Sequence, residues 1–159
     1  MKLLIDDANI EKIKRIYEYY AIDGVTTNPS ILAKNGKNPY ETLKEIREFI
    51  GKDAELHVQV VSNTAKEMVE EGHRIVKELG ENTYVKIPTV PEGLKAMKQL
   101  SKEGYKITAT AIYTPIQAYL AAKAGFLSSL WKTRLSTSQR LCFLQAQAQR
   151  GRLYDLNLD

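Results

Sequence analysis

Short apolar segments alternate with amphipathic stretches over the first 125 residues of this 159-residue chain. Predicted strands lie at residues 2–6, 24–27, 55–61, 84–87 and 106–113. Apolar residues at helical spacing follow each of them, as in amphipathic helices that pack on a sheet. Five consecutive strand–helix units predict an α/β fold with a parallel sheet and right-handed crossovers. The alternation by itself leaves two architectures open, a doubly wound sheet and a barrel.

The chain carries no glycine-rich phosphate loop of the Rossmann or Walker type, which counts mildly against a nucleotide-binding doubly wound domain. The predicted helices cover residues 10–17, 31–32, 40–50, 65–79, 94–100 and 115–124. Pro91 and Pro115 suit the first turns of the last two helices.

The alternation stops near Gly125, and the following residues differ in composition from the body of the chain. They are rich in Ser, Gln and Arg, with no acidic residue before Asp155. No strand signal follows Gly125. One face of a helix would fit the spacing of Leu127, Leu130, Trp131 and Leu135. The sequence therefore predicts two parts, a sheet-forming body over 1–125 and a helical tail over 126–159.

Composition excludes several classes of protein. The net charge of +4 comes from Lys and Arg interleaved with Glu, which is typical of solvated helix faces and not of a nucleic-acid-binding stripe. The single cysteine, Cys142, has no partner for a disulfide and no metal-ligand cluster around it. Asp6 and Asp7 interrupt the first apolar run too early for a signal peptide or membrane span. We expect a cytoplasmic protein without metal, membrane or nucleic-acid partners.

Lys86 lies within an apolar strand, between Val85 and Ile87. Burying an ammonium group costs several kcal/mol or more unless the group is paired or loses its proton. Two interpretations follow: an edge strand whose lysine points to water, or a buried amine that acts as a nucleophile toward carbonyl carbons.

Polar residues occur in or at the end of every predicted strand, where parallel α/β sheets place their chemistry. They are Asp6, then Thr26, Thr27 and Asn28, then Gln59, Lys86, and finally Thr108 and Thr110. Each has an ordinary explanation: Asp6 and Asn28 can cap helices, Gln59 can pair with backbone, and threonine suits strands. Their convergence around an amine nevertheless predicts a catalytic site.

Two histidines are candidates for the same site. His57 shares a strand face with Gln59, although a hydrogen-bonded core imidazole is the favoured interpretation. His73 lies in the charged run of residues 70–74, which indicates a solvated helix face, and no role is assigned to it.

These residues fit one reaction type. A neutral Lys86 adds to a ketone, water leaves, and the iminium withdraws electrons so that the neighbouring carbon–carbon bond can break. Asp6 is the candidate to accept the proton of the breaking hydroxyl. Gln59 and Thr110 are the candidates to position a water for proton transfer.

The polar strand ends resemble a known family. Asp6, the segment Gly24–Ser30 (GVTTNPS), Gln59, the segment Val85–Pro88 (VKIP) and the segment Thr108–Tyr113 (TATAIY) together look like the transaldolase family. More narrowly, they resemble its short bacterial branch, the fructose-6-phosphate aldolase-like enzymes. The resemblance extends from residue 1 to about residue 125.

This resemblance implies a (β/α)8 TIM barrel, of which the chain holds about five units, and a class I aldolase that works without metal or cofactor. It implies that Lys86 forms the Schiff base, that Asp6 is the acid/base and that Asn28 holds a substrate hydroxyl. Thr110 would help to hold the catalytic water, and Thr26, Thr27 and Thr108 would line the pocket for a sugar phosphate. Gln59 favours the aldolase, because transaldolases proper carry glutamate at that place. Transaldolase is the alternative.

The tail departs from the family, which continues with a sixth strand that supplies a tyrosine and an arginine. One choice of codons for Ser128–Leu135, read one nucleotide later, gives Ala-Pro-Tyr-Gly-Arg-Leu-Asp, in which only the glycine is fixed by the tryptophan codon. We therefore expect a frameshift origin for residues 126–159. An inactive remnant is the third alternative. The family's subunit rings use C-terminal helices that we do not find here, which leaves a homo-oligomer as an open expectation.

Overall fold

The computed structural model describes residues 2–125 and 128–129. The strands are β1 (Leu4–Asp6), β2 (Gly24–Thr26), β3 (Glu55–Gln59), β4 (Thr83–Pro88), β5 (Ile107–Thr110) and β6 (Ser128–Ser129). The helices are α1 (Ile10–Tyr19), α2 (Pro29–Lys34), α3 (Pro39–Ile50), α4 (Ala65–Leu79), α5 (Pro91–Lys102) and α6 (Pro115–Ala124). The predicted alternation of strands and helices is confirmed over the body of the chain.

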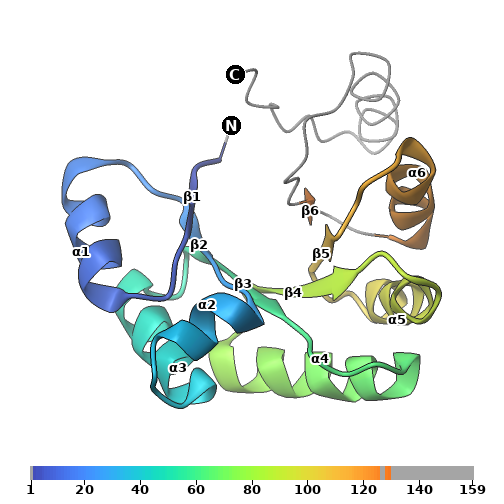
Figure 1. Cartoon of the computed structure of the whole chain (residues 1–159), viewed down its shortest axis with the longest axis horizontal. Coiled ribbons are helices and arrows are strands. Elements are labelled where there is room, and N and C mark those ends of the chain that lie inside the picture. The colour runs from blue at the N-terminus through green and yellow to red at the C-terminus, as the bar shows by residue number, and fades with distance from the viewer. Residues whose placement is uncertain (1, 126–127, 130–159) are drawn as a thin grey trace.

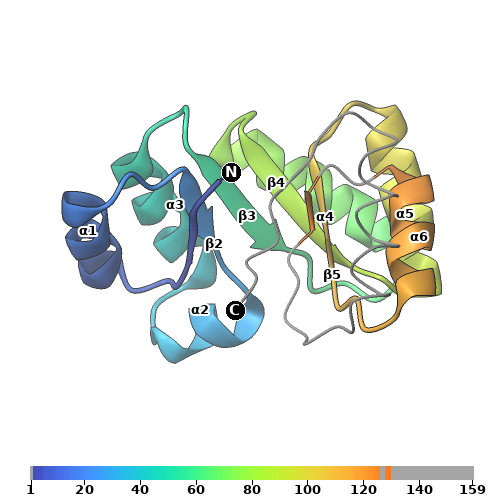
Figure 2. The ribbon, with the colours of Figure 1, turned by 90° about the horizontal axis from the view of Figure 1, so that it is seen from above.

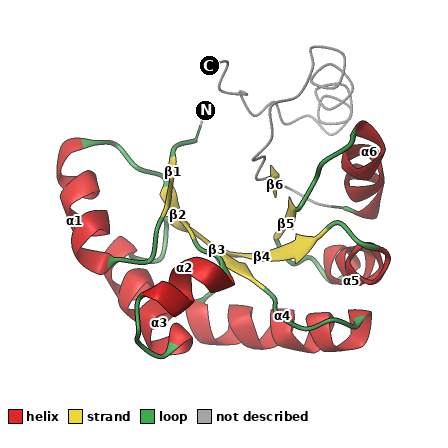
Figure 3. Ribbon diagram, viewed as in Figure 1, coloured by secondary structure: helices red, strands yellow, loops and turns green. Residues whose placement is uncertain are grey.

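The six strands form one parallel sheet in the order β1-β2-β3-β4-β5-β6. The sheet curves into an open arc with α1, α3, α4, α5 and α6 on its convex side (Figures 1 and 3). A doubly wound fold would reverse its strand order and carry helices on both faces. The sequential order and the one-sided helices are instead those of part of a (β/α)8 barrel, which decides the choice that the sequence left open.

The core lies between the convex face of the sheet and these helices. Outward-facing strand residues are apolar and buried: Ile5, Val25, Leu56, Val58, Val85, Ile87, Ile107 and Ala109. Ile13 from α1, Ile46 from α3, Met68 and Ile75 from α4, and Met97 and Leu100 from α5 pack against them. Because strand side chains alternate, every second residue points to the concave side.

Helix caps fix where the loops leave the strand ends. The side chain of Thr64 accepts from the Glu67 backbone at the start of α4, and Thr114 and Gln117 form a capping box at the start of α6. Both helices begin and end where the sequence predicts. Each cap satisfies backbone N–H groups that would otherwise lack a partner at the helix start.

Gly93 lets α5 lie directly against the end of β4. A Cβ atom at this position would be 1.9 Å from the carbonyl oxygen of Pro88. Only glycine permits this approach of the two backbones. The contact holds the end of the central strand, two residues after Lys86, at a fixed depth.

One expectation for the tail is wrong. The sequence gives no strand signal after Gly125, but Ser128 and Ser129 pair in parallel with Thr108 and Ala109 of β5. Two serines carry no apolar pattern, and the exposed N–H and C=O groups at the edge of β5 recruit the backbone without regard to side chains. Apart from Ser128 and Ser129, the helix predicted over residues 127–135 lies outside the described residues.

Among the described residues, no helix is both long enough and apolar enough to cross a lipid bilayer.

Candidate active site

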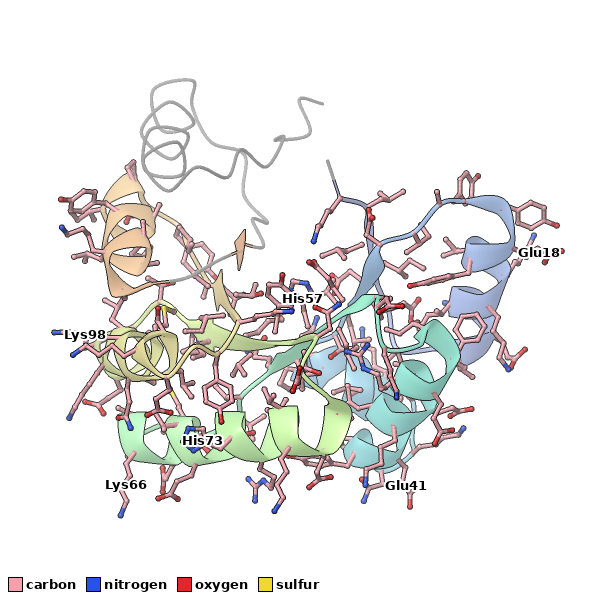
Figure 4. The ribbon with its side chains drawn as sticks, turned by 180° about the vertical axis from the view of Figure 1, so that it is seen from behind. Glu18, Glu41, His57, Lys66, His73 and Lys98 are labelled. Carbon is pink, nitrogen blue, oxygen red and sulfur yellow. The ribbon has the colours of Figure 1, made fainter. Side chains whose placement is uncertain are left out.

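Polar side chains gather on the concave face of the sheet, opposite the apolar core. Strand alternation places there the side chains of Asp6, Thr26, Glu55, His57, Gln59, Tyr84, Lys86, Thr108 and Thr110. The view from above in Figure 2 shows β3 and β4 in the middle of the sheet. In Figure 4, His57 lies among the strands, whereas Lys66 and Lys98 project from the outer helices.

Lys86 is buried in the central part of this face. Its side chain belongs to β4, which pairs with β3 on one side and β5 on the other, and the residue is only 3% exposed. The Nζ atom donates to the carbonyl oxygen of Thr27 at 2.6 Å and to Oγ1 of Thr26 at 3.1 Å. The edge-strand interpretation is therefore wrong, because β4 has no free edge on which a lysine could reach water.

Two predicted site residues flank Lys86 on the neighbouring strands. Gln59 of β3 and Thr108 of β5 are its register partners, on either side. Neighbouring strands lie about 4.8 Å apart, so the three side chains start side by side on one face. Gln59 is half-buried and Thr108 is fully buried.

The end of β5 has an unusual backbone. Thr110 is the register partner of Pro88, and its carbonyl oxygen accepts from the backbone N–H and the hydroxyl of Thr89 at 2.9 and 3.0 Å. The next residue, Ala111, has φ 56°, in the left-handed region. This conformation costs a non-glycine residue about 1–2 kcal/mol. It ends the strand three residues earlier than predicted and turns the chain away just after Thr110.

Asp6 occupies the end of β1 and is the register partner of Thr26. Its side chain is exposed, in contrast to that of Lys86. The two groups lie on the same face of the sheet, with β2 and β3 between their strands.

Asn28 and Thr27 both have structural bonds. The Asn28 side chain accepts from the backbone N–H of Ile31 at 3.0 Å and caps α2. The Thr27 hydroxyl donates to the carbonyl oxygen of His57 at 3.1 Å. These bonds leave the amide nitrogen of Asn28 to meet a ligand, and they direct the Thr27 carbonyl, not its hydroxyl, to Lys86.

Sequence reasoning missed Glu55, which lies below this site at the start of β3. Its carboxylate accepts from the Tyr84 hydroxyl at 2.8 Å and from Lys2, and lies 3.2 Å from Nε2 of His57. Nδ1 of His57 is 2.8 Å from Oγ1 of Thr108. The interpretation of His57 as a hydrogen-bonded core imidazole is confirmed. The alternation of Glu55, His57 and Gln59 on one strand face was the signal that could have found the acid.

Glu71 was also missed, because the run 70–74 indicated a solvated helix face. His73 does lie at the surface, but Glu71 is 6% exposed. Its carboxylate accepts from the backbone N–H groups of Val61 and Ser62 and from the Ser62 hydroxyl, at 2.7–3.1 Å. Glu71 therefore anchors the loop that follows Gln59.

A cavity of about 300 Å³ lies at the opposite ends of the strands, lined by Val76, Glu81, Thr83, Glu103, Gly104, Tyr105 and Lys106. It contains none of the predicted site residues. No cluster of three or more His, Cys, Asp or Glu in the described part of the chain has the arrangement of a metal site.

A sequence profile described as Transaldolase/Fructose-6-phosphate aldolase matches residues 3–144, which is most of the chain. The chain belongs to this family. Its membership agrees with the resemblance carried by the strand-end residues and with the (β/α)8 architecture of the described arc.

Relatives in the transaldolase/fructose-6-phosphate aldolase family carry both names. A "Probable fructose-6-phosphate aldolase" of Streptococcus pneumoniae is 43% identical over 126 residues, which cover 79% of this chain and 57% of that protein. A "Probable transaldolase" of Aquifex aeolicus is 47% identical over 125 residues, which cover 79% of this chain and 56% of that protein. The chain thus spans a little over half the length of these curated relatives.

Solved structures of more distant proteins share the fold. A racemase from Streptomyces coelicolor A3(2) superposes with a TM-score of 0.54 at 14% identity, covering 79% of this chain and 37% of that one. A mandelate oxidase variant gives 0.55 at 10% identity, covering 92% and 51%. At such identities the likeness shows the fold alone.

Proposed function

We propose that this family member uses Lys86 as a Schiff-base nucleophile in a class I aldolase reaction on a sugar phosphate. The observation that carries the proposal is the burial of this amine on the concave face, between Gln59 and Thr108 and against Thr26 and Thr27. Burial disfavours the charged form of an amine, and only the neutral form attacks a carbonyl.

The Lys86 amine lies against two oxygen acceptors, the carbonyl of Thr27 and the hydroxyl of Thr26. In the proposed reaction the lone pair adds to the ketone carbon, and loss of water gives an iminium. The bond between the next two carbons then breaks, with its electrons moving into the iminium to form an enamine.

The remaining predicted residues supply proton transfer and binding. Asp6 would accept the proton of the hydroxyl on the departing carbon, so that this carbon leaves as an aldehyde. Gln59 and Thr110 would position the water that exchanges protons with the enamine and hydrolyses the iminium. Asn28 would donate its amide N–H to a substrate hydroxyl. The substrate is fructose 6-phosphate, and the products are dihydroxyacetone and glyceraldehyde 3-phosphate.

Reductive trapping tests the nucleophile. The folded protein is incubated with dihydroxyacetone or fructose 6-phosphate, reduced with borohydride and digested, and the peptide that contains Lys86 is examined by mass spectrometry. We expect a covalent adduct on Lys86 that is absent from Lys86→Met. Lys106→Met is the matched control, because Lys106 contacts Asn82 and the Tyr84 ring at the other end of the sheet. Absence of any adduct in well-folded wild-type protein would favour the inactive remnant.

Product analysis separates the aldolase from its alternative. Free dihydroxyacetone released from fructose 6-phosphate without an acceptor supports the aldolase that Gln59 favours. Transfer of the three-carbon unit only when an acceptor aldehyde is added supports transaldolase. The frameshift origin of residues 126–159 stays a prediction, and sequencing the gene tests it.

A further inference from the structure

Four side chains of the concave face form a chain of hydrogen bonds that the proposed reaction does not use. The chain begins at Glu55, passes through His57 and ends at Thr108 beside Lys86, while Tyr84 stacks on the imidazole. Glu55 and His57 belong to β3, Tyr84 to β4 and Thr108 to β5. The bonds therefore join three adjacent strands across the face that carries the nucleophile.

Glu55 is the end of this chain of hydrogen bonds whose role as an acceptor is fixed. Donors from Lys2, Tyr84 and His57 converge on its carboxylate. Burial raises the pKa of Glu55, but hydrogen bonds from His57, Lys2 and Tyr84 outweigh burial and lower the pKa to about 2. An ionised carboxylate can only accept hydrogen bonds. The hydrogen between Glu55 and His57 must therefore belong to Nε2 of the imidazole.

His57 connects Glu55 to Thr108 on β5, and its tautomer sets which way the Thr108 hydroxyl points. Burial is the largest cause and lowers the pKa of His57, while the hydrogen bond and charge of Glu55 oppose this; the net shift is downward, so the imidazole is neutral near pH 7. Its ring lies 4.5 Å from the Tyr84 ring at an angle of 8°, which fixes the ring plane. A neutral imidazole with its hydrogen on Nε2 can only accept at Nδ1. The hydroxyl of Thr108, 2.8 Å away, must therefore donate to Nδ1.

We propose that Glu55 and His57 are positioning residues that lock the hydroxyl of Thr108, so that Thr108 offers only an oxygen lone pair to a ligand on Lys86. A serine-type hydroxyl normally rotates to donate or accept. Here its single hydrogen is committed to His57. Thr108 would then select a ligand that carries a hydroxyl donor next to the carbonyl carbon, as hydroxyketones do. This selection of ligands rests on the proposed Schiff-base function. The fixed orientation of the Thr108 hydroxyl, here called the lock, does not.

The opposite tautomer would reverse the preference. If Nδ1 of His57 carried the hydrogen, Thr108 would accept from it and would be free to donate to a ligand carbonyl. The charge on Glu55 distinguishes these two cases, because it sets which nitrogen of His57 is protonated.

Nitrogen NMR of the histidines tests the lock without any ligand. The chain contains only two histidines, so the spectrum of protein labelled with ¹⁵N-histidine is simple. His73 is the internal reference, because its Nε2 lies 2.6 Å from Glu103 at the surface. We expect a neutral His57 with the hydrogen on Nε2 at pH 7. A neutral ring with the hydrogen on Nδ1, or a charged ring, would overturn the proposal.

Trapping with two ketones tests the selection. We compare the concentrations of dihydroxyacetone and acetone that give half-maximal adduct on Lys86. Thr108→Val should lower the preference for dihydroxyacetone over acetone about tenfold, while Thr108→Ser keeps it. His57→Phe, which can still stack on Tyr84, should lower the preference less because it frees the hydroxyl to rotate.

The outcomes separate the two proposals. An unchanged preference in Thr108→Val overturns the selection by Thr108. No adduct with either ketone in the wild-type protein overturns the Schiff-base function, and the lock is then decided by the NMR result alone. If Thr108→Val does not fold, wild type is compared with His57→Phe, and an equal preference in these two proteins would contradict the proposal; Thr108→Ser is the control that should keep the preference.

Discussion

The middle of the sheet is buried on both faces, yet the two faces are opposite in chemistry. The convex face presents Leu56 and Val85 to the helices, both 0% exposed, whereas the concave face presents His57 and Lys86 at 0% and 3%. Apolar side chains on the convex face need only shape and volume to pack. Polar side chains on the concave face need a specific partner for each atom. The difference shows that burial alone does not distinguish the part that stabilises this fold from the part that can carry chemistry.

Replacing Lys86 by methionine should separate chemistry from stability most strongly. Lys86→Met is expected to abolish the borohydride-trapped adduct while the free energy of unfolding stays equal or rises, because an apolar side chain of similar length removes the cost of burying an amine. Mass spectrometry and denaturant unfolding measure the two quantities. An adduct that persists in Lys86→Met would move the nucleophile to another lysine.

Truncating the convex face should have the opposite effect. Leu56→Ala is expected to lower the free energy of unfolding by about 2–5 kcal/mol, since it leaves a cavity between the sheet and the helices. Leu3→Ala is the matched control, because Leu3 is 48% exposed and should change stability by about 0.5 kcal/mol or less. Equal losses in the two variants, measured in urea, would mean that the apolar core does not lie where we describe it.

Neutralising Glu55 should weaken the concave face in a way that depends on pH. Glu55→Gln is expected to lower the free energy of unfolding at pH 7 by about 1–3 kcal/mol, because three donors lose their charged acceptor. The pKa of Glu55 is lowered from 4.5 to about 2, so its contribution is present above pH 4.5 and is lost as pH falls through 2.

The difference between wild type and Glu55→Gln should accordingly shrink over this range of pH. Glu41→Gln serves as the control, because Glu41 is exposed on α3 (Figure 4) and should show little difference at any pH. A difference for Glu55→Gln that does not change with pH would show that the ionised carboxylate is not the source of the stability.

The smallest effect on stability is expected where one side chain serves both fold and ligand. Asn28→Asp keeps an oxygen that can cap α2, so the free energy of unfolding should change by less than about 0.5 kcal/mol. The substitution removes the amide donor, and adduct formation at low dihydroxyacetone should fall about tenfold. Asn28→Ala should lose about 1 kcal/mol as well. Unchanged trapping in Asn28→Asp would assign Asn28 to the fold alone.

The fold could be predicted from the sequence where the spacing of apolar residues agrees with residues that begin and end helices. Helices α4 and α6 begin and end as predicted, because Thr64 and Thr114 cap them and a glycine follows each. The fifth strand could not be bounded, since Ala111 adopts a left-handed conformation that its sequence does not signal. The short β6 escaped prediction because its pairing depends on the open edge of β5 and not on its own side chains.

The candidate site was predicted only in part, for a similar reason. The residues that stand at strand ends, such as Lys86 and Gln59, were found because parallel strands bring these ends together. Glu55 was placed in a strand without a role and Glu71 in a solvated helix face, because a charge in a sequence does not reveal the partners that bury it. Their roles depend on Tyr84, which lies on another strand, and on the backbone of Val61 and Ser62, which lies outside the helix of Glu71.

The sequence by itself determined the order of strands and helices, the family and the residues at the strand ends, because these follow from local periodicity and short motifs. Only the tertiary structure decided that the sheet curves with its helices on one side, and that Lys86 lies between Gln59 and Thr108 instead of at an edge. The contacts that join Glu55, His57 and Thr108 across the sheet were likewise decided there. Register between strands sets which side chains meet, and register arises from the packing of the whole sheet.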